Sequence, residues 1–374
     1  MKMNEIKSLG IKTSALGMGC MRYPTKPDGK IDHEKSIKMM ELCYESGINY
    51  YDTAYVYHGG ESETFIAKAL KKYPRDSYFI ADKLPCWDCK SLEDVDRIFD
   101  EELKRLDTDY IDFLMFHGFN KNSFKEMMDL GAYDHVLKKK KKGQIRYLGF
   151  SFHDNAETLD NITDAKPWDF AMLQINYMDW IRSDAAKLHE IMVKKQIPCM
   201  VMEPVRGGAL ANFSKKANAI LKKARPQDSI ASWAIRFAAS LENVPVVLSG
   251  MSDLEQIKDN LKTVNDPNGF TGEDMETIKR ALEVHGEDAV PCTQCKYCMP
   301  CPEGVDIAKA FFEYNHHKTW ADIGRLRHET NTMRKENTMP DKCTSCMVCV
   351  EKCPQKIDIP TELKKAEEYA NMMV

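Results

Sequence analysis

Eight short β-type segments alternate with amphipathic segments along the first two thirds of the chain, and this alternation restricts the fold more than any other feature. The predicted strands are Ala15–Met18, Asn49–Asp52, Tyr78–Lys83, Ile111–Phe116, Ile145–Phe150, Phe170–Asn176, Cys199–Met202 and Val246–Ser249. The clearest helix is predicted from Leu92 to Leu106, where apolar residues recur at helical spacing. Ser91 followed by Asp94 is an N-terminal capping pattern for that helix.

Eight strand–helix units in about 250 residues are what a (β/α)8 TIM barrel requires. The rival is a doubly wound open sheet, but no G-x-G-x-x-G motif follows the first predicted strand. The segment before Ala15, with a turn at Gly10, is expected to form a hairpin that closes the barrel floor. The fold class predicted is therefore α/β, with a barrel first.

Eight of the thirteen cysteines lie in two short runs near the C-terminus, and both runs end in Cys-Pro. CTQCKYCMPCP carries Cys292, Cys295, Cys298 and Cys301, and CTSCMVCVEKCP carries Cys343, Cys346, Cys349 and Cys353. The second run has the C-x2-C-x2-C-x3-C-P spacing of two-cluster ferredoxins. Structural zinc is the alternative, although zinc sites usually pair two C-x2-C hooks into a single set of four. We expect two [4Fe–4S] clusters and hence transfer of single electrons.

The fourth cysteine of such a run commonly ligates the other cluster. This predicts one set of ligands that joins the first three cysteines of the first run to Cys353. The second set joins the first three cysteines of the second run to Cys301. The first run departs from the usual spacing, because only Met299 and Pro300 separate its last two cysteines.

The boundary between the two predicted domains lies just before the first cysteine run. A helix is predicted over 271–285, so residues 1–287 are assigned to the barrel and 288–374 to the cluster domain. The gap between the runs contains helix-compatible segments at 305–315 and 321–335, and a last helix is predicted over 362–372. These lengths favour a small helical ferredoxin-like domain.

The overall composition is that of an ordinary globular protein, with 43% hydrophobic residues, 29% charged residues and a net charge of −4. This balance gives no indication of nucleic-acid binding. The lysine run 138–142 is interpreted as the solvent-exposed end of a helix before Gly143. We find no apolar leader and no apolar stretch of membrane-spanning length. A cytoplasmic location is expected, where thiols stay reduced.

Polar residues that could take part in catalysis lie at or just after the ends of three consecutive predicted strands. Asp52 with nearby Tyr57, Lys83 and His117 occupy the carboxyl ends, where a TIM barrel places its chemistry. Each residue alone has a structural explanation, as a helix cap, a surface charge or a core histidine. Their joint placement at one rim favours a catalytic set.

The strings YYDTAYVYHGGESE, IADKLP, LDTDYIDFLMFHG and GFSFHD resemble the aldo-keto reductase family over roughly residues 5 to 265. The resemblance implies a barrel and a catalytic tetrad matched by Asp52, Tyr57, Lys83 and His117. The cysteine-rich tail is similar to the ferredoxin extension of one bacterial and archaeal branch. The implied activity is nicotinamide-dependent reduction of a small aldehyde or ketone, or the reverse oxidation of an alcohol, with the clusters exchanging electrons with an external carrier.

The tetrad has a physical logic of its own. A carbonyl that accepts hydride becomes an oxyanion that must be protonated or held by donors. Tyr57 is the expected acid, and an adjacent Lys83 ammonium should make its phenol more acidic. Asp52 would keep Lys83 charged and oriented, while His117 would donate to the carbonyl oxygen.

The residues that the resemblance implies for nicotinamide binding are only partly present in this sequence. Ser151 and Gln174 match, whereas Phe152 followed by His153 replaces an asparagine, for which Asn176 could compensate. Arg206, Gly207 and Gly208 are candidates for binding the pyrophosphate. After the last predicted strand, Gly250 stands where the family has a lysine and Gln256 where it has an arginine. Ser249, Ser252 and Asn260 remain as candidate contacts there. The missing cations favour NAD(H) over NADP(H).

Three other interpretations stay open. A flavin could occupy the barrel, because flavins convert two-electron into one-electron steps. The barrel could be catalytically idle in an electron-transfer or redox-sensing protein, or the clusters could be purely structural. Cys86 and Cys89, a further C-x2-C pair after Lys83, are either loop thiols or a redox or metal pair beside the substrate.

Overall fold

The computed structural model describes residues 1–286, 289–292, 294–353 and 355–373. By contacts the chain divides into two compact units, one of 1–204 with 232–270 and one of 205–231 with 271–374. The first unit contains the predicted strands and the second contains both cysteine runs. The division by contacts differs from the predicted boundary at residue 288, because helix α9 (Lys215–Ala224) packs on helix α12 (Gly272–Gly286) within the second unit.

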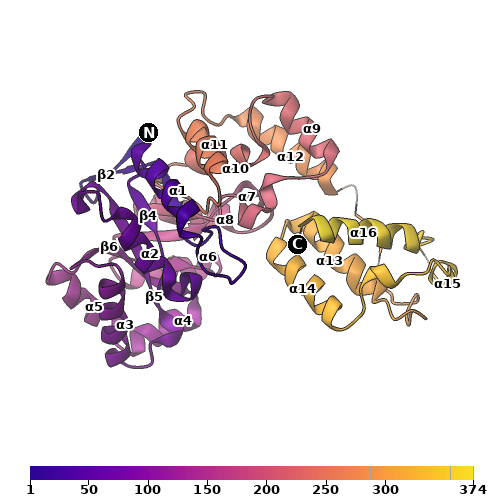
Figure 1. Ribbon diagram of the computed structural model, residues 1–374, viewed down its shortest axis with the longest axis horizontal. Helices are drawn as coiled ribbons and strands as arrows, with labels where there is room; N and C mark the ends of the chain where they lie inside the picture. Colours follow the sequence, from indigo (N-terminus) through magenta and orange to yellow (C-terminus); the bar gives the residue numbers. More distant parts are fainter. Residues whose placement is uncertain (287–288, 293, 354, 374) are drawn as a thin grey trace. The chain divides into compact units, whose positions relative to one another are not determined.

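Eight parallel strands close into a barrel in the first unit, which confirms the predicted fold class (Figure 1). The strands are β3 (Leu16–Gly19), β4 (Tyr50–Asp52), β5 (Phe79–Pro85), β6 (Ile111–Phe119), β7 (Ile145–Phe152), β8 (Phe170–Gln174), β9 (Cys199–Met202) and β10 (Val247–Ser249). Each overlaps its predicted segment, and β10 pairs with β3 to complete the circle. Gly149 is required where β7 meets β8, because a Cβ there would lie 2.5 Å from the carbonyl oxygen of Phe170.

Helices follow the strands around the barrel. Those of the first unit are α1 (His33–Glu45), α2 (Glu61–Leu70), α3 (Leu92–Arg105), α4 (Lys121–Asp129), α5 (Ala132–Lys141), α6 (Ala156–Ala165), α7 (Tyr177–Arg182), α8 (Ala185–Lys194), most of α10 (Ile230–Ala239) and α11 (Leu254–Val264), with short 3-10 turns η1 (Tyr57–Gly60), η2 (Arg75–Ser77) and η3 (Cys86–Asp88). The cap predicted for α3 is confirmed: Ser91 and Asp94 form a reciprocal capping box.

An antiparallel hairpin of β1 (Met3–Ile6) and β2 (Ile11–Ser14) precedes the barrel. Ile6 is buried in one apolar cluster with barrel residues that include Tyr50, Phe113 and Met200. The hydroxyl of Tyr147 donates to the carbonyl oxygen of Leu9 at 3.4 Å. The hairpin therefore closes the barrel floor, as expected.

The second unit is helical. Besides α9 and α12 it contains η4 (Arg206–Ala211), α13 (Ile307–Trp320), α14 (Ile323–Lys335), η5 (Pro340–Lys342), α15 (Val348–Glu351) and α16 (Ile359–Met373). Helices α13, α14 and α16 pack on one another (Figure 1). Their shared core contains Phe311, Ile357 and Leu363, and several cysteines of both runs pack against it. The predicted helical ferredoxin-like region is confirmed.

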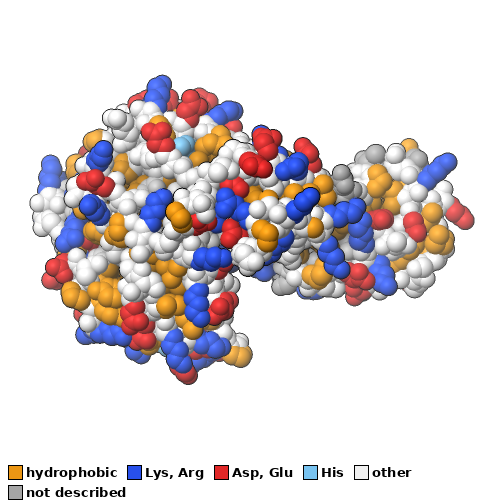
Figure 2. Space-filling view, turned by 90° about the horizontal axis from the view of Figure 1, so that it is seen from above, with side chains coloured by type: hydrophobic (Ala, Val, Ile, Leu, Met, Phe, Trp, Pro, Cys, Tyr) orange, Lys and Arg blue, Asp and Glu red, His pale blue; other side chains and the backbone are white. Residues whose placement is uncertain are grey.

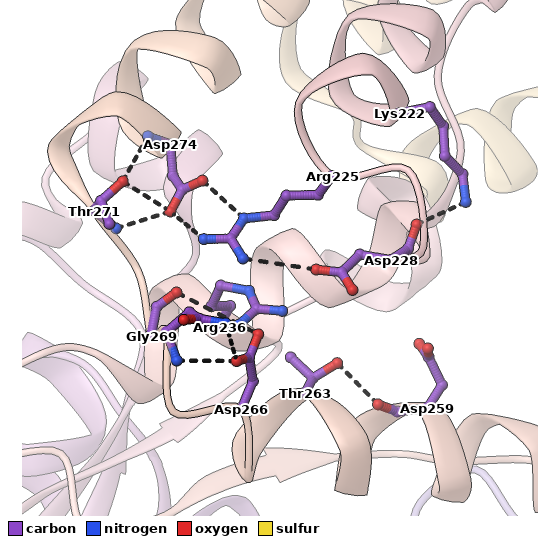
Figure 3. Close-up of polar contacts among 11 residues, drawn as sticks. Lys222, Arg225, Asp228, Arg236, Asp259, Thr263, Asp266, Gly269, Thr271 and Asp274 are labelled. Atoms are coloured by element: carbon purple, nitrogen blue, oxygen red, sulfur yellow. Dashed lines mark hydrogen bonds and ion pairs between the residues drawn. The ribbon is translucent and has the colours of Figure 1, made fainter.

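Partly buried ion pairs connect helical segments within each unit (Figure 3). In the second unit Arg225 donates to both carboxylate oxygens of Asp274 at 2.9 and 2.7 Å, and Asp274 also accepts from the backbone of Thr271. In the first unit Arg236 on α10 pairs with Asp266 after α11. A two-pronged guanidinium–carboxylate contact fixes orientation as well as charge.

Positive and negative side chains are interspersed over the face shown in Figure 2, in line with a net charge of −4. Within the part of the chain that the structure describes, no helix combines the length and the apolar character needed to span a bilayer.

Candidate functional site

The four tetrad residues come from three neighbouring strands of the barrel. Asp52 ends β4, Tyr57 opens η1 immediately afterwards, Lys83 lies in β5 and His117 in β6. Strands β4, β5 and β6 are adjacent and parallel, so their carboxyl ends share one rim. The structure brings all four side chains together there.

Lys83 and Asp52 form a buried ion pair. The Lys83 ammonium lies 2.6 Å from Oδ1 of Asp52 and donates to the carbonyl oxygen of Thr53 at 2.6 Å. Burial opposes the charged form of Lys83, but the negative charges of Asp52 and of a Tyr57 phenolate raise its pKa above the ordinary value. Lys83 therefore remains an ammonium at neutral pH.

The Lys83 ammonium also lies over the face of Tyr57, with Nζ 4.8 Å from the ring centroid. Burial raises the pKa of the Tyr57 phenol, and the ammonium opposes this without cancelling it. The expectation of a phenol more acidic than usual is thus corrected: desolvation of the phenolate outweighs the attraction of Lys83. Tyr57 carries its proton at neutral pH, and Lys83 reduces the cost of releasing it.

His117 faces the phenol from the next strand, with ring centroids 6.2 Å apart and planes at 82°. Burial, the Lys83 charge and His153 lower the pKa of His117 to about 3. Its Nδ1 is buried without a hydrogen-bond partner among the described residues. His117 is therefore a neutral imidazole, suited to donate a hydrogen bond to a carbonyl oxygen rather than to act as a charged acid.

The residues expected to hold a nicotinamide lie on β7 and β8. The hydroxyl of Ser151 accepts from the backbone N–H of Gly118 at 2.8 Å, which leaves its own hydrogen free to donate. The amide of Gln174 donates to Asp179 at 2.8 Å, and its carbonyl oxygen has no donor among the described residues. One donor and one acceptor remain, as a carboxamide requires. Asn176 instead caps α7: its side-chain oxygen accepts from the backbone N–H of Asp179 at 2.9 Å, and its amide nitrogen donates to the Asp179 carboxylate at 2.7 Å.

The segment after β10 is arranged around the start of α11. Asn260 donates to Ser249 at 3.0 Å in the interior. Gln256 accepts from the backbone of Ser252 and donates to Asp253, whose carboxylate caps the helix. The predicted side chains are therefore assembled, but an acidic cap occupies the helix N-terminus, where a 2′-phosphate would meet its charge.

Arg206, Gly207 and Gly208 lie in η4, which belongs to the second unit. Gly207 and Gly208 have φ values of 63° and 96°, so this turn depends on glycine.

Two cavities in the second unit are lined by the cysteines of both runs. Cys292, Cys295, Cys298 and Cys353 line one cavity, and Cys301, Cys343, Cys346 and Cys349 line the other. These are the two crossed sets expected from the spacing, and each supplies the four thiolates that a [4Fe–4S] cube requires. Among the described residues no three His, Cys, Asp or Glu side chains are close enough to bind a single ion, whereas a cube holds its thiolates around a larger centre. The donor sets fit two clusters.

The additional C-x2-C pair lies in and just after η3. Cys86 and Cys89 are both buried and unbonded to each other, and burial raises the pKa of both thiols. Thiols of raised pKa are poor nucleophiles. Between them Trp87 is 48% exposed and its ring lies 4.9 Å from that of His117.

A buried group of acids behind the tetrad was not predicted. Glu63 on α2, Asp82 on β5 and Glu102 on α3 are fully buried, and Asp82 accepts from the backbone N–H of Lys83 at 2.9 Å. Arg105 pairs with Glu63 at 2.8 Å. Burial and mutual repulsion raise the pKa of Asp82 and Glu102 far above the ordinary range. The sequence feature that could have indicated this group is Glu102, an acid on the apolar face of the helix predicted over 92–106.

Comparisons with known proteins agree with this geometry. The family model of the Aldo/keto reductase family matches residues 15–283, and that of the 4Fe-4S dicluster domain matches residues 291–357. The L-galactose dehydrogenase of Arabidopsis thaliana is 24% identical over 301 residues, which cover 74% of this chain and 92% of the relative.

The oxidoreductase YqkF of Bacillus subtilis (strain 168) is 24% identical over 296 residues, covering 71% of this chain and 92% of the relative. Among solved structures, the aldo-keto reductase AKR11C1 from Bacillus halodurans in its holo form superposes with a TM-score of 0.64, at 24% identity, over 75% of this chain and 96% of its own. This likeness supports the fold. The chain is an oxidoreductase that belongs to the aldo-keto reductase family and carries a C-terminal 4Fe-4S dicluster domain.

Proposed function

We propose that the barrel interconverts a small carbonyl compound and its alcohol with a nicotinamide dinucleotide, and that two [4Fe–4S] clusters exchange single electrons with an external carrier. The observation that carries the proposal is the tetrad: a buried ammonium held 2.6 Å from Asp52 and lying over the Tyr57 ring, beside a neutral His117. A bound nicotinamide would supply or accept the hydride.

The residues of the chain would control the proton. During reduction the carbonyl oxygen gains negative charge, and the Tyr57 phenol gives it a proton. The buried Lys83 ammonium stabilises the phenolate that remains, and the neutral His117 donates a hydrogen bond that orients the oxygen. Oxidation of the alcohol runs the same steps in reverse, with Tyr57 accepting the proton.

Ser151 and Gln174 would hold the carboxamide through the donor and the acceptor that they keep free. The crossed cysteine sets would hold the clusters. A hydride carries two electrons, and two clusters that each take one electron can receive both. We propose NAD(H) as the preferred dinucleotide, on the ground of the acidic cap of α11.

The test uses protein purified under anaerobic conditions with its clusters in place. Tyr57→Phe should lower carbonyl turnover by at least about 10²-fold, the usual contribution of a general acid, while the Kd for NADH stays within about twofold. Tyr55→Phe, a change of a neighbouring tyrosine that bonds Glu101 on the surface of α3, is the matched control. Undiminished turnover in Tyr57→Phe would remove the proposed acid.

A second experiment tests whether electrons pass between the nicotinamide and the clusters. NADH added without a carbonyl should bleach the visible absorption of the clusters, and an unchanged spectrum would contradict electron exchange between the two cofactors. A yellow chromophore released by heat from the purified protein would favour a flavin in the barrel instead.

A further inference from the structure

The two cysteine runs share one backbone conformation, so their side chains can be compared position by position. The residues on either side of the second cysteine of each run have left-handed φ values between 57° and 66°; they are Gln294 and Lys296 in the first run and Ser345 and Met347 in the second. Three residues after the last cysteine of each run, Gly304 and Lys356 have φ values of 76° and 54°. Their N–H groups donate to the carbonyl oxygens of Cys301 and Cys353 at 3.0 and 3.1 Å. The second unit therefore contains two equivalent cysteine loops that differ in their side chains.

The crossing of the last cysteines assigns each loop position to a site. We call the cavity lined by Cys292, Cys295, Cys298 and Cys353 the Cys292 site, and the cavity lined by Cys301, Cys343, Cys346 and Cys349 the Cys301 site. Because the last cysteine of each run lines the other cavity, the residue two positions after it does so too. Gln355 lines the Cys292 site, and Glu303 lines the Cys301 site.

The charges that line the two sites have opposite signs. Apart from the cysteines, Lys296 is the one charged residue among the described residues that line the Cys292 site, and Glu303 is the one at the Cys301 site. At the equivalent positions of the opposite site stand the neutral residues Met347 and Gln355. The two sites therefore differ by two charges, a lysine in place of a methionine and a glutamine in place of a glutamate.

Two further lysines lie close to the loops, one at each. Lys356 is exposed at the position that Gly304 holds in the other loop. The ammonium of Lys342, next to Cys343, lies 3.3 Å from the place of a Cβ on Gly304 and donates to the carbonyl oxygen of Asn337 at 3.0 Å. Since each loop has one such lysine, the difference made by Lys296 and Glu303 remains.

A hydrogen bond to sulfur distinguishes the sites in the same direction. The side-chain amide of Gln294 donates to Sγ of Cys292 at 3.4 Å and to the carbonyl oxygen of Ala308 at 3.1 Å, so its orientation is fixed. Among the described residues, no side chain donates to a sulfur of the Cys301 site, and the short Ser345 stands at the position of Gln294. Cys349 is moreover buried, whereas the equivalent Cys298 is partly exposed. Burial disfavours additional negative charge.

We propose that the two clusters are unequal electron acceptors: the cluster at the Cys292 site has the higher reduction potential and takes the first electron, and the cluster at the Cys301 site takes the second. The inference rests on the part of the proposed function that places [4Fe–4S] clusters in both cysteine sets. A cluster gains one negative charge on reduction, so the Lys296 ammonium and a donor to sulfur stabilise its reduced form, whereas the Glu303 carboxylate destabilises it. Each cluster takes up one electron from a reductant, and no bond is formed or broken. The cluster at the Cys301 site is then the stronger reductant of the two.

A redox titration of the cluster-loaded protein tests the order without any turnover. Sodium dithionite is added under anaerobic conditions with redox mediators, and electron paramagnetic resonance follows the reduced clusters. The wild type should show two separate one-electron transitions. Lys296→Met should lower only the higher potential, changing the ratio of reduced to oxidised cluster about tenfold, or roughly 59 mV for a one-electron couple. Gln294→Ser should shift the same transition in the same direction.

Each substitution introduces the residue found at the equivalent position of the other site, and the reverse changes should have the opposite effect. Glu303→Gln and Met347→Lys should each raise only the lower potential, since both make the Cys301 site less negative. Met347→Lys removes no charge and no hydrogen-bond donor, so it remains decisive if another variant loses iron. Lys335→Met is the matched control: it removes an exposed lysine at the end of α14 that lines neither site, and should leave both potentials unchanged.

The outcomes distinguish the inference from the proposed function. A single unresolved transition in the wild type, or a shift of the lower potential in Lys296→Met, would overturn the order of the two clusters. Full iron content without bleaching by NADH would overturn the proposed coupling alone, because dithionite still measures both potentials. Zinc in place of iron, or far fewer than about eight irons per chain, would overturn the proposed clusters and the inference with them.

Discussion

Replacing Glu102 with glutamine should stabilise the barrel unit at alkaline pH. Glu102 is fully buried on α3, and neither of its carboxylate oxygens has a hydrogen-bond donor among the described residues. Glu63 lies close enough for its negative charge to repel a Glu102 carboxylate. Burial and this repulsion raise the pKa of Glu102 well above the ordinary value, so the folded protein holds it as a neutral acid.

The direction of the pH effect follows from proton counting. The unfolded chain releases the Glu102 proton above about pH 4.3, whereas the folded chain keeps it up to its raised pKa. Between these two values unfolding releases a proton, so the stability contributed by this group falls as the pH rises. It is fully present below the unfolded pKa and is lost progressively towards the folded pKa. Glutamine, which resembles the neutral acid, has no proton to release.

The magnitude is about 1.4 kcal/mol per pH unit for one such proton. From pH 6 to pH 8 the wild type should therefore lose up to about 2.7 kcal/mol that Glu102→Gln keeps. Urea unfolding under anaerobic conditions, followed by tryptophan fluorescence, measures the difference at the two pH values. Four of the five tryptophans lie in the first unit, so this signal reports mainly on the barrel.

Glu93→Gln is the matched control, because Glu93 lies on the same helix but is exposed to solvent. Its stability difference from the wild type should be the same at pH 6 and pH 8. If Glu102→Gln lowered stability equally at both pH values, Glu102 would have to be a bonded carboxylate and the reasoning would be refuted. An infrared carbonyl band of a protonated acid at neutral pH, reduced in Glu102→Gln, would give direct support.

Two other predictions concern the tetrad and the clusters. Lys83→Met leaves a buried, unpaired Asp52 and should lower the free energy of unfolding by about 3–5 kcal/mol, and adding Asp52→Asn should recover most of this loss in the same urea assay. The double variant Cys301→Ser, Cys343→Ser removes two ligands from one cavity and should leave about four irons per chain. The double variant Cys301→Ser, Cys292→Ser removes one ligand from each cavity and should disturb both clusters. Equal iron counts in the two double variants would contradict the crossed sets.

The strands were predictable because a parallel barrel buries both faces of each strand, which produces compact apolar runs such as Cys199–Met202. The two cysteine runs were predictable because ligand spacing is a local property of the sequence, and the crossed sets follow from the usual exchange of the fourth cysteine between two clusters. The tetrad was predictable because carboxyl ends of consecutive strands must meet at one rim. All three inferences use only order and spacing along the chain.

Properties that depend on the packed surroundings could not be predicted in the same way. Lys83 next to Tyr57 suggested a phenol more acidic than usual, but the net direction depends on how completely both groups are desolvated. Asn176 was a reasonable candidate for a cofactor contact until the register of α7 showed that its amide caps that helix.

The acid group explains how the barrel can keep a lysine charged in its interior without leaving several buried charges uncompensated. Lys83 and Asp52 neutralise each other on the inner side of the barrel wall. Asp82 is the preceding residue on β5, and successive side chains of a strand point to opposite faces, so it lies on the outer side of the same wall. An ionised Asp82 would be a second negative charge close to the Lys83 ammonium, in addition to Asp52. Burial and the charge of Glu63 keep Asp82 neutral instead. Asp82 accepts a hydrogen bond from the backbone N–H of Lys83 and so fixes the lysine without changing its charge. Burial thus raises the pKa of the outer acids, whereas the inner lysine keeps its charge against its burial because Asp52 lies beside it.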